Sequence, residues 1–115
     1  MQVREELDIL SVTTTVDSPA AARTLAHEIL AQRLGACVQI DQGVTSLYHW
    51  QGALREEPEV RLAIKTLPAC AAALQALFAR YHPYEVPQFL AQHMRASPAY
   101  ADWVRAETLV PKAEP

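Results

Sequence analysis

The thiols and imidazoles are the side chains of this chain with the widest chemical range. The sequence has two cysteines, Cys37 and Cys70, and four histidines, His27, His49, His82 and His93. A thiolate binds soft metal ions such as Cu(I) or Zn(II), but one cysteine is far short of a coordination sphere. The histidines form no HxH, HxxxH or HExxH pair, so a metal site would have to be assembled in three dimensions or between subunits. The simpler alternative is that each cysteine is a small buried hydrophobe.

Carboxylates form the second candidate group. Glu56, Glu57 and Glu59 follow one another closely and could bind a hard cation or do acid–base work. For Glu56 and Glu57 a solvated turn is the favoured interpretation. Glu59 begins an alternating segment that also carries Lys65, and an acid–base pair of these two is the one enzymatic hypothesis. A nucleophile motif and a glycine-rich phosphate loop are both absent from the sequence.

Length and composition limit the classes of protein to consider. With 115 residues, of which 50% are hydrophobic and 20% charged, the chain fits one globular domain, residues 1–115. The net charge of −3, with both signs interspersed, gives no basic face for nucleic acid. The N-terminal residues lack the pattern of a signal peptide and no apolar run is long enough to span a membrane, so a cytoplasmic protein is expected. Residues 110–115 are expected to form a frayed tail.

The first elements of the chain are a strand and a helix. Residues 7–16 are rich in β-branched side chains and predict a mostly buried strand. Ser18 is suited to cap a helix and Pro19 to its first turn, while apolar residues recur at helical spacing as far as Leu30. Gly35 is expected to end this helix in a left-handed conformation.

A long β-hairpin is expected next. Residues 36–40 alternate as a strand, and Gly43 predicts a bend or bulge before the strand continues to Tyr48 and Trp50. Gln51-Gly52 is a turn signal, and residues 60–65 alternate as the returning strand. The tip of this hairpin carries tryptophan and charge.

The second half of the chain repeats helix and strand. Pro68 opens a helix that Pro83 ends, residues 87–94 fit a strand, and Ser97-Pro98 begins a short third helix. The order βαββαβ plus a C-terminal helix predicts an α+β, ferredoxin-like fold with an antiparallel sheet and both main helices on one face. The other face must be covered, by the third helix or by another subunit, so we expect a homo-oligomer.

Five segments in order carry a resemblance to a known family. They are L-G-A-C-V (34–38), T-S-L-Y-H-W-Q-G (45–52), E-V with A-I-K-T (59–66), H-P-Y-E-V-P (82–87) and Y-x-x-W (100–103). In this combination the chain resembles the CutA family of divalent-ion tolerance proteins. The likeness extends from about residue 7 to residue 109, which is nearly the whole chain.

The resemblance implies a ferredoxin-like subunit in a homotrimer, similar in shape to the PII signalling proteins, without an assigned reaction. It implies tolerance of copper or another divalent cation, with Cys37 at the family position proposed in copper binding. The residues expected at a ligand-binding cleft between subunits are Tyr48, Trp50, Glu59, Lys65, His82, Tyr84 and Glu85. The chain departs from the family at Gln39 and Gln51, where asparagine and glutamate are frequent, and the adjacent His93 and Met94 form a soft-ligand pair of its own.

Two functions of different classes follow. The first is a non-enzymatic homotrimer that binds a metal ion or a small ligand at clefts between subunits. The alternative is a PII-like signalling or adaptor protein that engages a partner through the hairpin tip, for which an exposed Trp50 would be the anchor.

Overall fold

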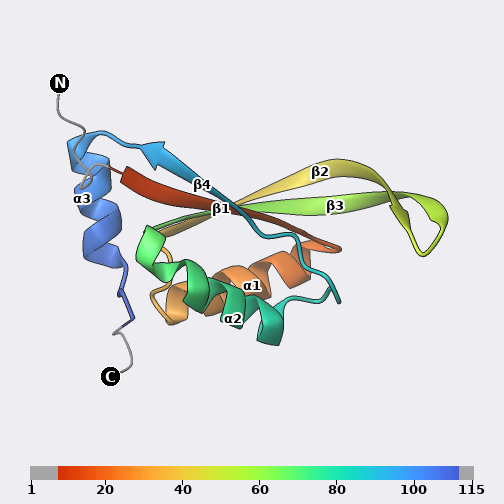
Figure 1. Ribbon diagram of the computed structural model, residues 1–115, viewed down its shortest axis with the longest axis horizontal. Coiled ribbons are helices and arrows are strands. Elements are labelled where there is room, and N and C mark those ends of the chain that lie inside the picture. Colours follow the sequence, from red (N-terminus) through yellow and green to blue (C-terminus); the bar gives the residue numbers. More distant parts are fainter. Residues whose placement is uncertain (1–7, 112–115) are drawn as a thin grey trace.

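The computed structural model describes residues 8–111, which form an antiparallel four-stranded sheet with two helices across one face and a third helix at one end (Figure 1). The strand order is β2-β3-β1-β4. The elements are β1 (Asp8–Val16), α1 (Pro19–Ala31), β2 (Cys37–Trp50), β3 (Ala53–Thr66), α2 (Ala71–Tyr81), β4 (Leu90–Arg95) and α3 (Pro98–Glu107), with a 3-10 turn η2 (Pro68–Cys70) before α2. This confirms the α+β, ferredoxin-like fold. Residue 7 of the predicted first strand and residues 112–115 of the predicted tail lie outside the described residues.

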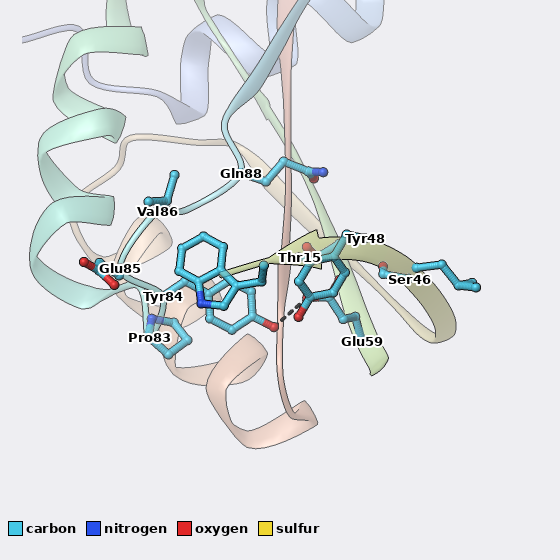
Figure 2. A pocket seen from close by; sticks show the side chains of 11 residues that line it. Thr15, Ser46, Tyr48, Glu59, Pro83, Tyr84, Glu85, Val86 and Gln88 are labelled. Atoms are coloured by element: carbon cyan, nitrogen blue, oxygen red, sulfur yellow. Dashed lines mark hydrogen bonds between the residues drawn. The ribbon is translucent and has the colours of Figure 1, made fainter. Parts of the chain in front are cut away.

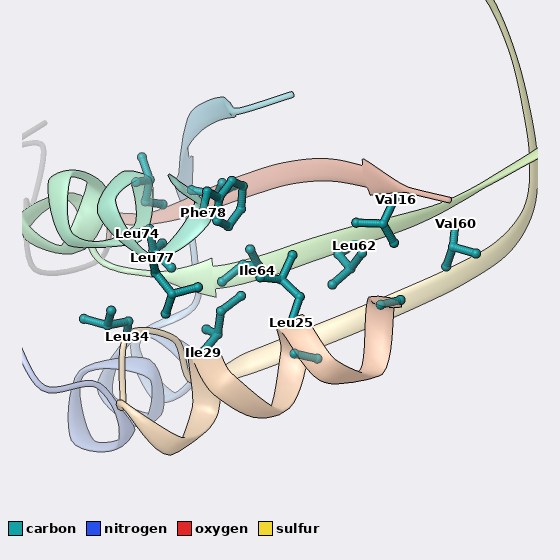
Figure 3. Packing of buried hydrophobic residues seen from close by; sticks show 14 residues of the cluster. Val16, Leu25, Ile29, Leu34, Val60, Leu62, Ile64, Leu74, Leu77 and Phe78 are labelled. Carbon is teal, nitrogen blue, oxygen red and sulfur yellow. The ribbon is translucent and has the colours of Figure 1, made fainter. Parts of the chain in front are cut away.

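The main core lies between the sheet and the helices α1 and α2. Alternate residues of β1 and β3, among them Val16, Leu62 and Ile64, point to the helices, where Leu25 and Phe78 meet them (Figure 3). Helix α1 starts as the sequence predicts, because Ser18 Oγ accepts a hydrogen bond from the backbone N–H of Ala21 at 3.1 Å and Pro19 occupies the first turn.

The role predicted for Gly35 is wrong. Helix α1 ends at Ala31, and the residue with a left-handed backbone after it is Arg33, with φ 57°. A Cβ atom on Gly35 would lie 2.9 Å from Cγ2 of Ile64 and 3.2 Å from Cγ2 of Ile29. This glycine is therefore needed because the chain crosses close to the core, not because of its backbone angle.

A bulge divides β2 into two halves. Asp41 lies opposite Arg61 and Val44 lies opposite Glu59, so three steps along β2 match two steps along β3. Gly43 has φ +88°, which confirms the predicted irregularity there. Because the bulge adds one residue, Tyr48 joins the face of the hairpin that carries Glu59, instead of the opposite face that strict alternation would give it.

Beyond the bulge the hairpin leaves the sheet. Strand β1 pairs with β3 only up to Val16 and Val60, so residues 44–50 and 53–59 pair with each other alone. We call residues 44–59 the arm; it projects beyond the end of β1 (Figure 1). Its tip is the predicted two-residue turn, in which Gln51 (φ 51°) and Gly52 (φ 80°) both have positive φ, as a type I′ turn requires.

The fourth strand begins later than the sequence suggests. It starts at Leu90 and not at Pro87, because Phe89 turns toward the helices and packs edge to face on Phe78, with ring centroids 5.3 Å apart. Helix α3 then covers one end of the second sheet face, where a smaller core joins Ile9, Leu67, Cys70, Ala101 and Val104. The rest of that face is not covered by this helix.

Candidate functional site

A pocket of about 670 Å³ lies between the arm and the segment that follows α2. The arm contributes Tyr48 and Glu59, and the segment after His82 contributes Tyr84 and Glu85 (Figure 2). Trp50 of the arm also lines the pocket. The remaining lining residues are Thr15, Ser46, Leu47, Pro83, Val86 and Gln88. Three aromatic side chains and two carboxylates thus share one concave site, of the size that small-molecule sites usually have.

Hydrogen bonds fix the geometry of one wall of the pocket. The Tyr84 hydroxyl donates to Oε2 of Glu59 at 2.5 Å (Figure 2). The backbone N–H of Tyr84 donates to Nδ1 of His82 at 3.1 Å, so the neutral imidazole carries its proton on Nε2 and donates to Oγ1 of Thr14 at 2.9 Å. These contacts tie the segment after α2 to β1 and to the arm.

Burial shifts the pKa values of His82 and Tyr84, the two ring side chains that take part in these hydrogen bonds. It lowers the pKa of His82 below 6.5, against the weaker opposing effects of a backbone hydrogen bond at Thr15 and the charges of Asp17 and Glu59. Burial, followed by the hydrogen bond to Glu59, raises the pKa of Tyr84 well above 10.0. At neutral pH the imidazole is therefore uncharged and the phenol remains a donor.

Glu59 is a buried carboxylate without a cationic partner in the described chain. Its side chain is 8% exposed. Among residues 8–111 the ion pairs are Arg33–Glu107, Arg61–Asp41 and Arg105–Asp102, none of which involves it. Arg55, on the same face of the arm, lies opposite Tyr48 and does not line the pocket. A buried negative charge of this kind favours binding of a positive group.

Two of the residues predicted for a cleft lie outside this pocket. His82 is buried behind Tyr84, and Lys65 lies on the open face of the sheet, where its Nζ donates to Oγ of Ser11 at 3.4 Å. Six residues of extended strand separate Lys65 from Glu59, about 20 Å. The interpretation of these two as an acid–base pair is therefore wrong.

Some lining residues were not anticipated. Pro83 and Val86 lie inside the segment H-P-Y-E-V-P, so the motif indicated their place, if not their role. Thr15 carries no such signal. It reaches the pocket only because β1 ends beside the arm, which is a property of the tertiary fold.

The soft candidate ligands do not gather in one subunit. Cys37 is half-buried at the start of β2, opposite Lys65 in the strand register. His93 and Met94 are neighbours in β4, so their side chains point to opposite faces and cannot act as a ligand pair. Within residues 8–111, no group of three His, Cys, Asp or Glu side chains is placed to hold a metal ion.

The fold and the pocket together define a class, a ferredoxin-like α+β domain with a ligand-sized pocket beside an extended hairpin. Residues 10–107 match the family described as CutA1 divalent ion tolerance protein. The chain is 39% identical over 98 residues to the divalent-cation tolerance protein CutA of Thermus thermophilus, covering 84% of this chain and 95% of the relative. The chain belongs to the CutA family.

Two solved structures share the fold of this chain. The crystal structure of CutA1 from Oryza sativa superposes with a TM-score of 0.87 at 30% identity, over 92% of this chain and 98% of that chain. The structure from Archaeoglobus fulgidus has a TM-score of 0.83 at 24% identity, over 86% and 97% of the two chains, and is described as a periplasmic divalent cation tolerance protein. The cytoplasmic location expected for the present chain stays a prediction.

No helix in the described part of the chain has the length and apolar character needed to cross a membrane.

Proposed function

We propose that this protein is a homotrimer that serves divalent-cation tolerance by binding a small ligand or metal ion in clefts between subunits. The single observation that carries the binding site is Glu59, a buried carboxylate that faces a pocket of about 670 Å³. The pocket opens beside the arm, so a neighbouring subunit that packs on the arm would complete its outer wall.

The arm supports the oligomer. Seven residue pairs, from Val44–Glu59 to Trp50–Ala53, have no third strand beside them. A two-stranded ribbon is marginally stable alone in water. The arm also exposes apolar side chains, among them Leu47 at 62% and Leu54 at 67%. Packing against other subunits would remove this surface from water.

For the metal, we propose copper or another divalent cation with Cys37 as one ligand. Because the described part of one subunit supplies no complete ligand set, the remaining ligands would come from neighbouring subunits. Cys37 lies on the open face of the sheet, which is accessible to a neighbouring chain.

Light scattering coupled to size-exclusion chromatography tests the assembly. We expect a mass three times the 12.7 kDa of one chain at micromolar concentration. A mass of one chain would reject the trimer and with it the shared clefts.

Calorimetric titration with Cu(I), Cu(II) and Zn(II) tests the metal. We expect saturable binding that Cys37→Ala abolishes and that Cys70→Ala, the matched change at the other thiol, preserves. Absence of saturable binding, or equal binding by the Cys37→Ala protein, would reject Cys37 as a ligand.

Exposure at the hairpin tip supports the second candidate function, an adaptor of the PII kind. Trp50 is 38% exposed in the single chain, and exposed tryptophan is a frequent anchor of protein interfaces. If Trp50 becomes fully shielded from an aqueous fluorescence quencher in the oligomer, the adaptor hypothesis loses its anchor.

A further inference from the structure

The chemistry of the pocket walls narrows the class of ligand that the proposed binding site would take. The walls include the rings of Tyr48, Trp50 and Tyr84, which come from two separate segments of the chain. The π faces of such rings attract cations within about 6 Å of the ring centre, most strongly when water is excluded. The pocket thus combines three aromatic side chains with one buried carboxylate, a lining suited to positive charge.

The same walls are poor partners for a bare metal ion. A divalent ion needs four or more oxygen, nitrogen or sulfur ligands at about 2.0 to 2.6 Å. Here one oxygen of Glu59 already accepts the hydrogen bond from Tyr84, and Glu85 lies exposed at the pocket. Within residues 8–111 no third acidic, histidine or cysteine side chain completes a ligand set.

The size of the pocket favours a polyatomic cation. A volume of about 670 Å³ is many times that of a single ion and lies in the range of sites for small organic molecules. An alkylated ammonium group is large and weakly hydrated, so it gives up little solvation when its methyl groups contact aromatic rings.

We propose that this pocket binds a small organic cation with an alkylated ammonium group. Its charge lies against Glu59, and its methyl groups contact the ring of Tyr84, which is hydrogen-bonded to that carboxylate, while Tyr48 and Trp50 line the rest of the pocket. The inference rests on the proposed function, in that it takes the pocket to be the ligand site, and it names the class of ligand. It does not depend on Cys37, which is not among the residues that line the pocket.

Tryptophan fluorescence provides a direct test, because the chain has two tryptophans and only Trp50 lines the pocket. In the Trp103→Phe protein, Trp50 is the sole indole. We expect choline chloride to change its emission in a saturable way at constant ionic strength. The neutral carbon isostere 3,3-dimethyl-1-butanol should bind at least about tenfold more weakly, since it lacks the charge.

Glu59→Gln in the same background should weaken choline binding by about tenfold or more, while Glu56→Gln, an exposed carboxylate on the other face of the arm, should leave it unchanged. If Glu59→Gln fails to fold, as judged by its thermal unfolding curve, Glu85→Gln at the exposed side of the pocket gives the same test, with an expected loss of about threefold.

The outcomes separate this inference from the proposed function. Equal binding of choline and its neutral isostere would overturn the organic-cation inference and leave a ligand site in place. Binding of neither compound would overturn the organic-cation inference, whereas the metal binding proposed at Cys37 stands or falls with the calorimetric titration. The emission of Trp50 could instead depend on protein concentration and not on choline. This result would show that a side chain of a second copy fills the pocket, and it would also overturn the inference.

Discussion

At the scale of single residues, His82 links the wall of the pocket to the pH dependence of stability. Its pKa is lowered by burial, so between the folded value and 6.5 the unfolded chain binds a proton that the folded chain does not. Acidification therefore favours unfolding in this window. We expect the contribution of His82 to the free energy of unfolding to be independent of pH well above 6.5 and to fall as the pH decreases through this window.

Urea unfolding between pH 5 and pH 7.5 measures this effect. The His82→Gln protein should show a smaller loss of stability below pH 6.5 than the unmodified protein. The control variant His27→Gln, at an exposed position of α1, should lose as much stability as the unmodified protein. Parallel pH profiles for the unmodified and the His82→Gln proteins would contradict the prediction.

The Tyr84→Phe substitution tests the hydrogen bond between the Tyr84 hydroxyl and the carboxylate of Glu59. Tyr84→Phe keeps the ring in the pocket and removes the only hydroxyl that donates to this carboxylate among the described residues. Hydrogen bonds to charged groups contribute about 1.5 to 3 kcal/mol to the free energy of unfolding. Because this ring is partly exposed, we expect Tyr84→Phe to lower the free energy of unfolding by an amount near the lower end of that range. Tyr100→Phe, an exposed tyrosine of α3, is the matched control, and equal melting temperatures of the two variants would argue against the prediction.

Single residues also show what a sequence can and cannot predict. Tyr84 and Glu85 were found through a motif, and the structure places both in the pocket. Lys65 was paired with Glu59 because the two are close in sequence, whereas an extended strand carries them about 20 Å apart. Sequence distance predicts spatial distance only once the type of element is known.

At the scale of elements, Gly35 marks the passage from α1 to β2. Because its missing Cβ would meet Ile64 and Ile29, Gly35→Ala should destabilise the protein by about 1 to 3 kcal/mol through overpacking. Gly35→Asn distinguishes a glycine required for a left-handed helix cap from a glycine required for close packing. Asparagine tolerates a left-handed backbone, but its side chain does not fit a close contact. We expect Asn to be at least as damaging as Ala in chemical denaturation. Recovery of stability with Asn would restore the capping role.

The elements themselves were largely predictable. Caps at Ser18 and Ser97, and the turn at Gln51-Gly52, have local chemical signals that the structure confirms. The start of β4 has no local sequence signal, because the position of Phe89 is decided by its contact with Phe78, a residue of another element. Contacts between elements are what the local pattern cannot supply.

At the scale of the whole molecule, the arm should control assembly. Leu54→Asp places a charge on an exposed apolar position of the ribbon, which opposes burial between subunits. If the arm lies in the interface, this change should lower the mass seen by light scattering or shift dissociation to a higher protein concentration. Glu56→Ala, two residues further along the same face, should not.

The position of the core outside the arm allows a control for folding of the Leu54→Asp protein. The residues of the main core lie outside the arm, with Val60 at its edge. The far-ultraviolet circular dichroism of Leu54→Asp should therefore remain that of a folded chain. An unchanged oligomer of this variant would show that the arm is not in the interface.

The bulge at Gly43 decides which side chains of β2 line the pocket. A β-branched residue at φ +88° is strained, and a chain that kept its length but lost the bulge would have to slip by one position. The slip would put Leu47 and His49 on the face of the arm that carries Glu59, in place of Tyr48 and Trp50, and the pocket would lose two of its three aromatic side chains.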